Sequence, residues 1–274
     1  EYIKAGKEYL TENKVINYEF PGDCVKLFGL LNKQKRVIKS KILDIKPNPV
    51  PEIIKNEIKK AKEDNLTSLK QETVHMIMDY YKLNYPKSEN FTDKNEALKF
   101  CESLFPKKLV LKISSPDVIH KNDMKGVYLN IDDQDKFNKA WDELNETIKK
   151  YEIKNASILI QEMIGKSVET IIGVNDDPNF GKVMVFGSGG IYTEIIQDTS
   201  IRILPTDDFD EMMKETKIGK ILQGVRGEEP KAIDKLIDTF RKIQQLAYDI
   251  PEIVSIDANP TLVSNESAAI VDFK

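Results

Sequence analysis

The sequence is short of residue types that often mark a function. It holds two cysteines and two histidines in 274 residues. Cys24 and Cys101 are too few for a disulfide framework and lack metal-ligand spacing, so we expect reduced thiols. Only four of the 41 basic residues are arginine: Arg36, Arg202, Arg226 and Arg241. Because histidine is so scarce, the position of each one is informative.

The chain also lacks a basic excess and long apolar runs. Its net charge is -4, and this acidic balance gives no electrostatic footprint for nucleic acid. No uninterrupted apolar stretch approaches the roughly 18 residues that span a bilayer, and "EYIKAGKEYL" at the start contains no apolar signal core. With 40% apolar and 31% charged residues, the composition is that of a soluble globular protein. We predict a cytoplasmic protein with neither a nucleic-acid nor a membrane partner.

Three stretches follow one another along the chain. Residues 1–36 are expected to form a strand at 15–20 and a helix at 24–36, a unit too small to fold alone. Residues 37–66 contain three prolines and a lysine-rich run, which favours a linker with one solvated helix. Residues 67–274 alternate between helical and strand patterns. The chain begins with this incomplete unit and without methionine, so we expect a fragment whose upstream partner is missing.

The third stretch predicts a mixed α/β (α+β) domain with antiparallel strand pairs rather than a strict βαβ series. Thr67 is the expected N-cap of its first helix. Helices are expected at 67–84, 93–105, 133–151, 207–222 and 230–248. Strands are expected at 108–113, 126–131, 157–164, 167–174, 182–186, 192–197, 252–258 and 268–273.

The glycine-rich segment "GSGG" at 187–190 follows a predicted strand. Glycine lets the backbone approach a ligand closely, but the segment lacks the Lys-Ser/Thr of a Walker loop and leads into a strand rather than a helix. On its own it favours a plain hairpin turn.

Charged and polar residues interrupt two apolar strands. Lys112 ends "LVLK", where burial of an ammonium group is costly unless it meets an anion such as phosphate. A lysine that snorkels into solvent fits equally well. Gln161 and Glu162 lie in the apolar strand "ILIQEMI", which costs free energy unless their side chains find partners. An exposed strand edge would also explain them. A crossover segment whose backbone donor and acceptor bind the edge of adenine is a third explanation.

The C-terminal strands and the histidines hold further candidates. A hairpin of the observed length would bring Asn259 and Asp272 together as hard oxygen ligands for Mg²⁺, although a turn is the simpler explanation of a single Asn-Pro. His75 lies within a predicted helix and is expected to be structural. His120 lies in a polar loop between "SSPDV" and "KND", where function is more common.

Taken together, these segments resemble a known family. The stretch "LKISSPDVIHKNDMKGV" is similar to the signature of the nucleotide-binding subunit of ADP-forming acyl-CoA synthetases, the acetate–CoA ligase relatives of succinyl-CoA synthetase. The resemblance continues through "ILIQEMIGKSVETIIGV", "GSGGIYTEIIQDTSIRILP", "GVRGEEP" and "IDANP". It covers about residue 66 to the C-terminus without a large gap. The first 36 residues more weakly resemble the end of the family's CoA-ligase half.

The resemblance implies an ATP-grasp fold, in which two α+β subdomains clamp the nucleotide. The implied domains are a CoA-ligase remnant at 1–36, a linker at 37–66 and the ATP-grasp domain at 67–274. Lys112 would contact phosphate, and Asn259 and Asp272 would bind Mg²⁺. The implied ATP or ADP contacts are Glu162, Met163 and Ile164 for adenine, Glu169 for ribose, and Gly187, Gly189 and Gly190 for the phosphates.

The implied reaction is acid + CoA + ATP ⇌ acyl-CoA + ADP + phosphate. His120 matches the family histidine that carries the phosphoryl group, and Arg202 in "IRILP" is implied as a further catalytic group. The implied partner is a CoA-ligase half, upstream or in a separate subunit, through which CoA and an organic acid would bind. The full-length protein is expected to be an oligomer.

Three positions depart from the family pattern. Lys125 replaces a usual glycine, Ser188 a usual proline or leucine, and Ser255 a usual acidic residue.

Two other functions are compatible with the same fold: a ligand-sensing module of an acetyltransferase-type fusion, and a carboxylate–amine ligase. Neither needs a phosphorylatable histidine, so the presence of His120 favours the acyl-CoA synthetase.

Overall fold

The computed structural model describes residues 2–18, 20–39, 43–115, 124–189, 198–225 and 227–274. The chain divides into two compact units, Glu1–Leu43 and Asp44–Lys274. Among the described helices, none is long and apolar enough to cross a membrane.

The first unit contains two helices, α1 (Tyr2–Glu12) and α2 (Pro21–Lys39). The predicted strand at 15–20 is wrong, because residues 15–18 have irregular backbone. A strand needs a neighbour to bond its backbone groups, and the described part of this unit contains helices only. The predicted helix at 24–36 lies within α2, and α1 was not predicted.

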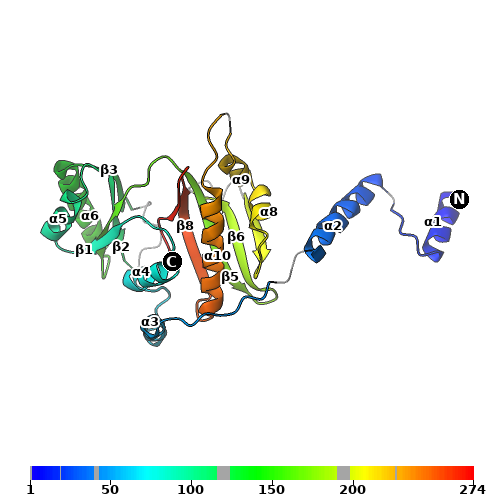
Figure 1. Cartoon of the computed structure of the whole chain (residues 1–274), viewed down its shortest axis with the longest axis horizontal. Coiled ribbons are helices and arrows are strands. Elements are labelled where there is room, and N and C mark those ends of the chain that lie inside the picture. The colour runs from blue at the N-terminus through cyan, green and yellow to red at the C-terminus, as the bar shows by residue number, and fades with distance from the viewer. Residues whose placement is uncertain (1, 19, 40–42, 116–123, 190–197, 226) are drawn as a thin grey trace. The chain divides into compact units, whose positions relative to one another are not determined.

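The second unit holds two sheets, which Figure 1 shows side by side. Sheet A has the order β1-β4-β2-β3, and sheet B has the order β7-β6-β5-β8-β9. All pairings among these described strands are antiparallel, as expected from the sequence. The strands of sheet A are β1 (Ser88–Phe91), β2 (Leu109–Ser114), β3 (Val127–Ile131) and β4 (Ser157–Glu162). Those of sheet B are β5 (Val168–Asp177), β6 (Gly181–Ser188), β7 (Thr199–Ile203), β8 (Ser255–Val263) and β9 (Ala268–Ile270).

Helices cover one face of each sheet, so each sheet has its own core (Figure 1). Sheet A carries α5 (Lys94–Glu102) and α6 (Gln134–Lys150), and sheet B carries α8 (Phe209–Lys214), α9 (Lys217–Leu222) and α10 (Ile233–Asp249). In β2 the alternating residues Leu109, Leu111 and Ile113 are fully buried in the core of sheet A. Because strand side chains alternate between faces, Val110 and Lys112 lie on the opposite face.

Two helices precede sheet A in the sequence but pack with sheet B: α3 (Glu52–Glu63) and α4 (Gln71–Tyr80). The expectation of a solvated helix within a linker at 37–66 does not fit α3, whose Ile54 and Ile58 are buried in the core of sheet B. The second compact unit accordingly begins within that segment. The N-cap of α4 is Lys70 rather than Thr67.

Side-chain hydrogen bonds also hold this N-terminal segment on α10. Asp249 accepts from the backbone N–H of Asn48 at 2.6 Å and from the Tyr81 hydroxyl at 2.9 Å. Burial, followed by the bond to Asp249, raises the pKa of Tyr81 and keeps its hydroxyl a donor.

The predicted strand at 192–197 lies outside the described residues, and the short strands β1 and β7 were not predicted.

The docking of α3 can be tested with two adjacent isoleucines. Ile54 is 2% exposed and Ile53 is 62% exposed. Ile54→Ala should lower the free energy of unfolding by about 2–4 kcal/mol, because truncation leaves a cavity in the core. Ile53→Ala should change it by no more than about 0.5 kcal/mol. Urea denaturation measures both, and equal losses would contradict the packing of α3.

Candidate active site

Lys112 lies on the face of sheet A that is turned away from the sheet's helices. Its side chain is buried rather than snorkelling, with 6% of the residue exposed. The ammonium donates to the Gln161 Oε1 at 3.2 Å and to the Val271 carbonyl oxygen at 3.1 Å. Gln161 belongs to β4 of sheet A, whereas Val271 follows β9 of sheet B. The predicted phosphate-binding lysine therefore lies where the two sheets meet.

The two predicted metal ligands are adjacent in space. The backbone N–H of Asn259 donates to the carbonyl oxygen of Asp272 at 3.0 Å, as the expected hairpin requires. Asp272 directly follows Val271, so the backbone of this pair lies near the Lys112 ammonium. Lys274 Nζ lies 3.8 Å from the Asp272 carboxylate.

A third carboxylate, Asp257, lies on the same strand as Asn259. Surrounding protein atoms partly desolvate the Asp257 carboxylate and so raise its pKa. The residue as a whole is nevertheless exposed to solvent. Lys274 opposes this shift, and repulsion from Asp272 adds to it.

Amide and carboxylate oxygens suit Mg²⁺, so the donor set fits this ion. Within the described ranges no group of three or more His, Cys, Asp and Glu side chains could hold a metal. Asn259 and Asp272 would therefore hold Mg²⁺ together with nucleotide phosphate oxygens, as such sites commonly do.

The predicted adenine segment ends β4. The N–H of Glu162 donates to the Lys87 carbonyl oxygen at 2.9 Å, and that of Met163 to the Lys108 carbonyl oxygen at 2.8 Å. The Glu162 carboxylate lies 2.8 Å from Lys107 Nζ. Among the hydrogen bonds of the described residues none involves the N–H of Ile164, so this amide is the one of the three left for a ligand.

The glycine segment does not form the plain hairpin turn that its sequence favours, since Gly187 and Ser188 lie within β6. A Cβ on Gly187 would lie 2.6 Å from the Asp198 carbonyl oxygen, and one on Gly189 would lie 3.1 Å from backbone atoms of Glu169 and Thr170. The Gly189 N–H donates to the Glu169 carbonyl oxygen at 2.9 Å. A Cβ at 187 would force neighbouring atoms to move, and one at 189 would be tightly packed.

Arg202 on β7 is held by carboxylates. Its guanidinium donates to Asp208 Oδ2 at 3.0 Å and to Glu215 Oε2 at 2.9 Å. Burial would lower its pKa, but these bonds outweigh burial and raise it. A catalytic role for Arg202 stays a prediction.

His120 and Gly190 lie outside the described residues. Lys125, C-terminal to His120, has φ of +54°, a conformation that glycine adopts without strain. The other histidine, His75, stacks on Tyr85 and lies 3.2 Å from Gln71 Nε2. Burial lowers the pKa of His75, which fits its structural interpretation.

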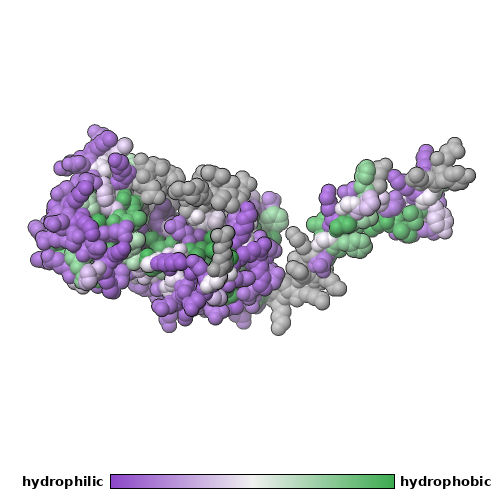
Figure 2. Space-filling model, turned by 90° about the horizontal axis from the view of Figure 1, so that it is seen from above, coloured by the Kyte–Doolittle hydropathy of each residue, from purple (hydrophilic) through white to green (hydrophobic). Residues whose placement is uncertain are grey.

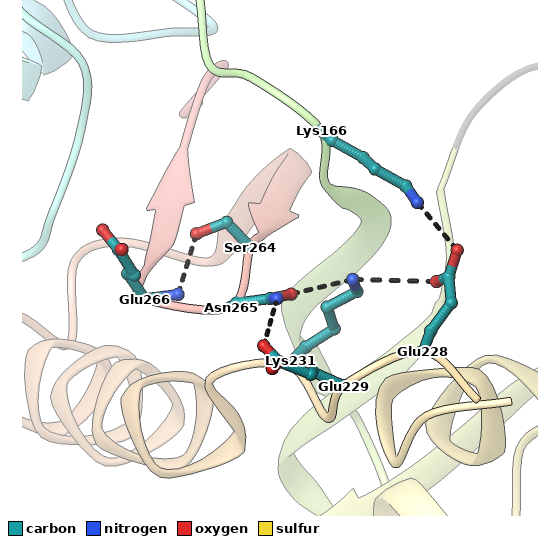
Figure 3. Close-up of a pocket in the computed structure, with 7 residues that line it drawn as sticks. All are labelled: Lys166, Glu228, Glu229, Lys231, Ser264, Asn265 and Glu266. Atoms are coloured by element: carbon teal, nitrogen blue, oxygen red, sulfur yellow. Dashed lines mark hydrogen bonds and ion pairs between the residues drawn. The ribbon is translucent and has the colours of Figure 1, made fainter.

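A polar pocket of about 430 Å³ was not predicted (Figure 3). Several of its polar groups bond one another: Glu228 lies 2.7 Å from Lys166 Nζ and 3.8 Å from Lys231 Nζ, and Lys231 donates to Asn265 at 2.9 Å. The two lysines hold the pKa of Glu228 low. The segment "GVRGEEP" supplies its two central glutamates. The lining residues are Lys166, Glu228, Glu229, Lys231, Ser264, Asn265 and Glu266.

Comparison with known proteins places this architecture in a family. The model of the ATP-grasp domain matches residues 60–274. The β subunit of the ADP-forming acetate–CoA ligase II of Pyrococcus furiosus is 35% identical over 214 residues, covering 75% of this chain and 90% of that protein. The ADP-forming acetate–CoA ligase of Methanocaldococcus jannaschii is 34% identical over 274 residues, covering 96% of this chain and 39% of that protein.

A solved structure agrees with both sequence relatives. Acetyl-coenzyme A synthetase 1 of Ca. Korarchaeum cryptofilum, in complex with coenzyme A and Mg-AMPPCP, is 32% identical, with a TM-score of 0.68. The match covers 80% of this chain and 97% of that one. In that structure the phosphohistidine segment points towards the nucleotide binding site.

The chain belongs to the ATP-grasp family. Within it, the chain belongs with the β subunits of ADP-forming acetate–CoA ligases. The recognition from sequence, the fold of two subdomains and the assignment as the nucleotide-binding half of an acid–thiol ligase are confirmed by this membership. The ligase names of these relatives do not support the alternative of a ligand-sensing acetyltransferase module. Magnesium binding by this chain and a cytoplasmic location stay predictions.

The need for glycine at 187 can be tested within sheet B. Gly187→Ala should lower the free energy of unfolding by about 1–3 kcal/mol, because the new methyl group meets rigid backbone. Gly173→Ala is the control, since its Cβ would meet only the Ile256 carbonyl oxygen, at 3.7 Å. Thermal unfolding compares the two. A Gly187→Ala variant as stable as the parent chain would contradict the crowding.

Proposed function

We propose that this chain binds Mg-ATP or Mg-ADP and serves as the phosphoryl-relay half of an ADP-forming acyl-CoA synthetase. The observation that carries the proposal is the meeting of Lys112 with the segment that follows β9 and contains Asp272. Lys112 belongs to sheet A and this segment follows a strand of sheet B, yet Lys112 Nζ lies 3.1 Å from the carbonyl oxygen of Val271, the residue before Asp272. This contact supports the proposal, because phosphoryl transfer requires an ammonium for phosphate and a carboxylate for the metal in one region of the site.

Each residue has a defined task in this proposal. Lys112 binds a phosphate oxygen of the nucleotide, while Asn259 and Asp272 hold Mg²⁺, which would neutralise charge on the transferred group. The Ile164 N–H and neighbouring carbonyl groups bind the adenine edge. Glu169 lies by the ribose, and the close contact between Gly189 and the Glu169 backbone supports a shared nucleotide surface.

His120 is the proposed phosphoryl carrier. A neutral imidazole nitrogen forms a bond to the γ-phosphorus, the bond to the β–γ bridging oxygen breaks, and ADP leaves with that electron pair. The support is the match of His120 to the family signature, together with the phosphohistidine segment of the Korarchaeum relative.

The proposed partner is a CoA-ligase half, through which CoA and an organic acid bind. The chain spans only about two fifths of the longer Methanocaldococcus relative, where it aligns over 39% of the length. A match covering 96% of this chain must include most of Glu1–Leu43. We infer that residues 1–36 belong structurally to the CoA-ligase half.

The surface of the first unit supports this assignment. Figure 2 shows apolar residues gathered on it, and Val25 and Phe28 of α2 are each 71% exposed. Apolar clusters of this kind commonly mark an interface. Other large exposed apolar residues of the unit are Tyr9, Leu10, Val15, Ile16, Tyr18, Phe20, Leu30 and Leu31.

The metal ligand can be tested by calorimetry. Asp272→Asn should weaken Mg-ATP binding at least about tenfold, or ~1.4 kcal/mol, because it removes a charged Mg²⁺ ligand. Asp210→Asn removes the same charge from an exposed position in α8 and should leave affinity within about twofold. With EDTA the parent and both variants should bind ATP equally weakly. Equal Mg-ATP affinities of the parent and Asp272→Asn would contradict the assignment of Asp272 as a metal ligand.

The relay can be tested with γ-labelled ATP. The parent chain should acquire acid-labile, base-stable label, and His120→Ala should abolish it while leaving nucleotide affinity nearly unchanged. His75→Gln, at the only other histidine of the sequence, should still be labelled. An unlabelled parent, or label that persists in His120→Ala, would refute the role of His120.

The interface can be tested in a protein that includes the CoA-ligase half. Phe28→Asp should lower the melting temperature of that half, because a charge would be buried in the contact. Phe180→Asp changes a phenylalanine of the turn between β5 and β6 that is 61% exposed, and it should have no such effect. Equal melting temperatures would refute the docking of α2.

A further inference from the structure

Gln161 is a buried amide in an apolar strand of sheet A. It is 4% exposed, and its neighbours Leu159 and Ile160 are buried as well. An amide in such a place costs free energy unless both its oxygen and its nitrogen find partners. Gln161 has both partners, and each belongs to the candidate active site.

The first partner of Gln161 is Lys112. In the register of β2 and β4, Gln161 faces Val110 and Lys112 faces Leu159, so Gln161 and Lys112 are diagonal neighbours on one face. The Lys112 ammonium donates to Gln161 Oε1 at 3.2 Å. This bond sets the direction of the lysine side chain.

The second partner is the Val271 carbonyl group of sheet B. Gln161 Nε2 donates to its oxygen at 3.3 Å, and Lys112 Nζ donates to the same oxygen at 3.1 Å. The three groups form a closed triangle across the two sheets. Val271 is followed at once by Asp272, the proposed metal ligand.

This triangle has a consequence for the reaction. An ammonium at the end of a flexible four-carbon side chain has many rotamers, and phosphoryl transfer tolerates little misplacement. Gln161 restricts that freedom, because it holds the ammonium against the Val271 carbonyl group, next to Asp272.

We propose that Gln161 is a positioning residue for phosphoryl transfer, which acts by holding Lys112 beside the segment of Val271 and Asp272 that follows β9. The inference rests on the proposed function, since it assumes that Lys112 binds a nucleotide phosphate.

The test is the rate of histidine labelling by γ-labelled ATP over a range of Mg-ATP concentrations. Gln161→Leu should lower the rate at saturating Mg-ATP by about 10–100-fold, because a misdirected ammonium impairs the transfer itself. The half-saturating concentration should change less than about threefold, because most nucleotide contacts remain. A merely structural role would not produce this split.

A matched control and a double variant complete the test. Ser88 lies directly opposite Gln161 across β1 and β4, but its hydroxyl lies 3.4 Å from His75. Ser88→Ala should therefore label within about twofold of the parent rate. Lys112→Met combined with Gln161→Leu should be slowed by much less than the product of the two single losses, because Gln161 acts through Lys112.

The outcomes separate this role from the proposed function. A parent chain that is not labelled would overturn both. If the parent is labelled, three results would overturn the role of Gln161 alone. The kinetics of Gln161→Leu could be unchanged, or its saturating rate and its half-saturating Mg-ATP concentration could change by the same factor. The losses of the two single variants could also multiply in the double variant. If thermal melting shows that Gln161→Leu does not fold, Gln161→Met, whose side chain is unbranched and of similar length, undergoes the same kinetic test.

Discussion

A buried ammonium group sets the main constraint on this structure. Lys112 is 6% exposed, and removing its charge from water is costly unless protein oxygens replace the lost hydration. Gln161 supplies one oxygen from sheet A and Val271 supplies another from sheet B. Neither sheet alone supplies both oxygens, so the position of the ammonium depends on how the two sheets meet.

The two-sheet architecture makes this arrangement available. Each sheet buries one face under helices, and strand periodicity leaves the other side chains on the open face. In β2 this alternation buries Leu111 and Ile113 in the core and puts Lys112, between them, on the opposite face. In sheet B, Gly187 and Gly189 let backbone segments approach where a Cβ would collide. Core packing and site geometry thus come from the same strands.

The sequence predicts the parts of the site that depend on local spacing. Hairpin length brings Asn259 to Asp272, and the cost of a buried amide marks Gln161. Long-range packing escapes such reasoning. The lysine-rich composition of α3 hides its buried pair Ile54 and Ile58, although their i, i+4 spacing was visible. The carboxylate partners of Arg202 come from later helical segments, so no local pattern reveals them.

The triangle around Lys112 is also open to exchange. Its bonds to Gln161 and Val271 run from a charged donor to neutral oxygens. A phosphate oxygen carries a negative charge, so it attracts the ammonium by Coulomb interaction in addition to accepting its hydrogen bond. Nucleotide binding in the proposed reaction therefore favours transfer of the ammonium from the Val271 carbonyl to phosphate. Gln161 keeps its own bond to Val271 and so preserves the link between the sheets while Lys112 changes partner.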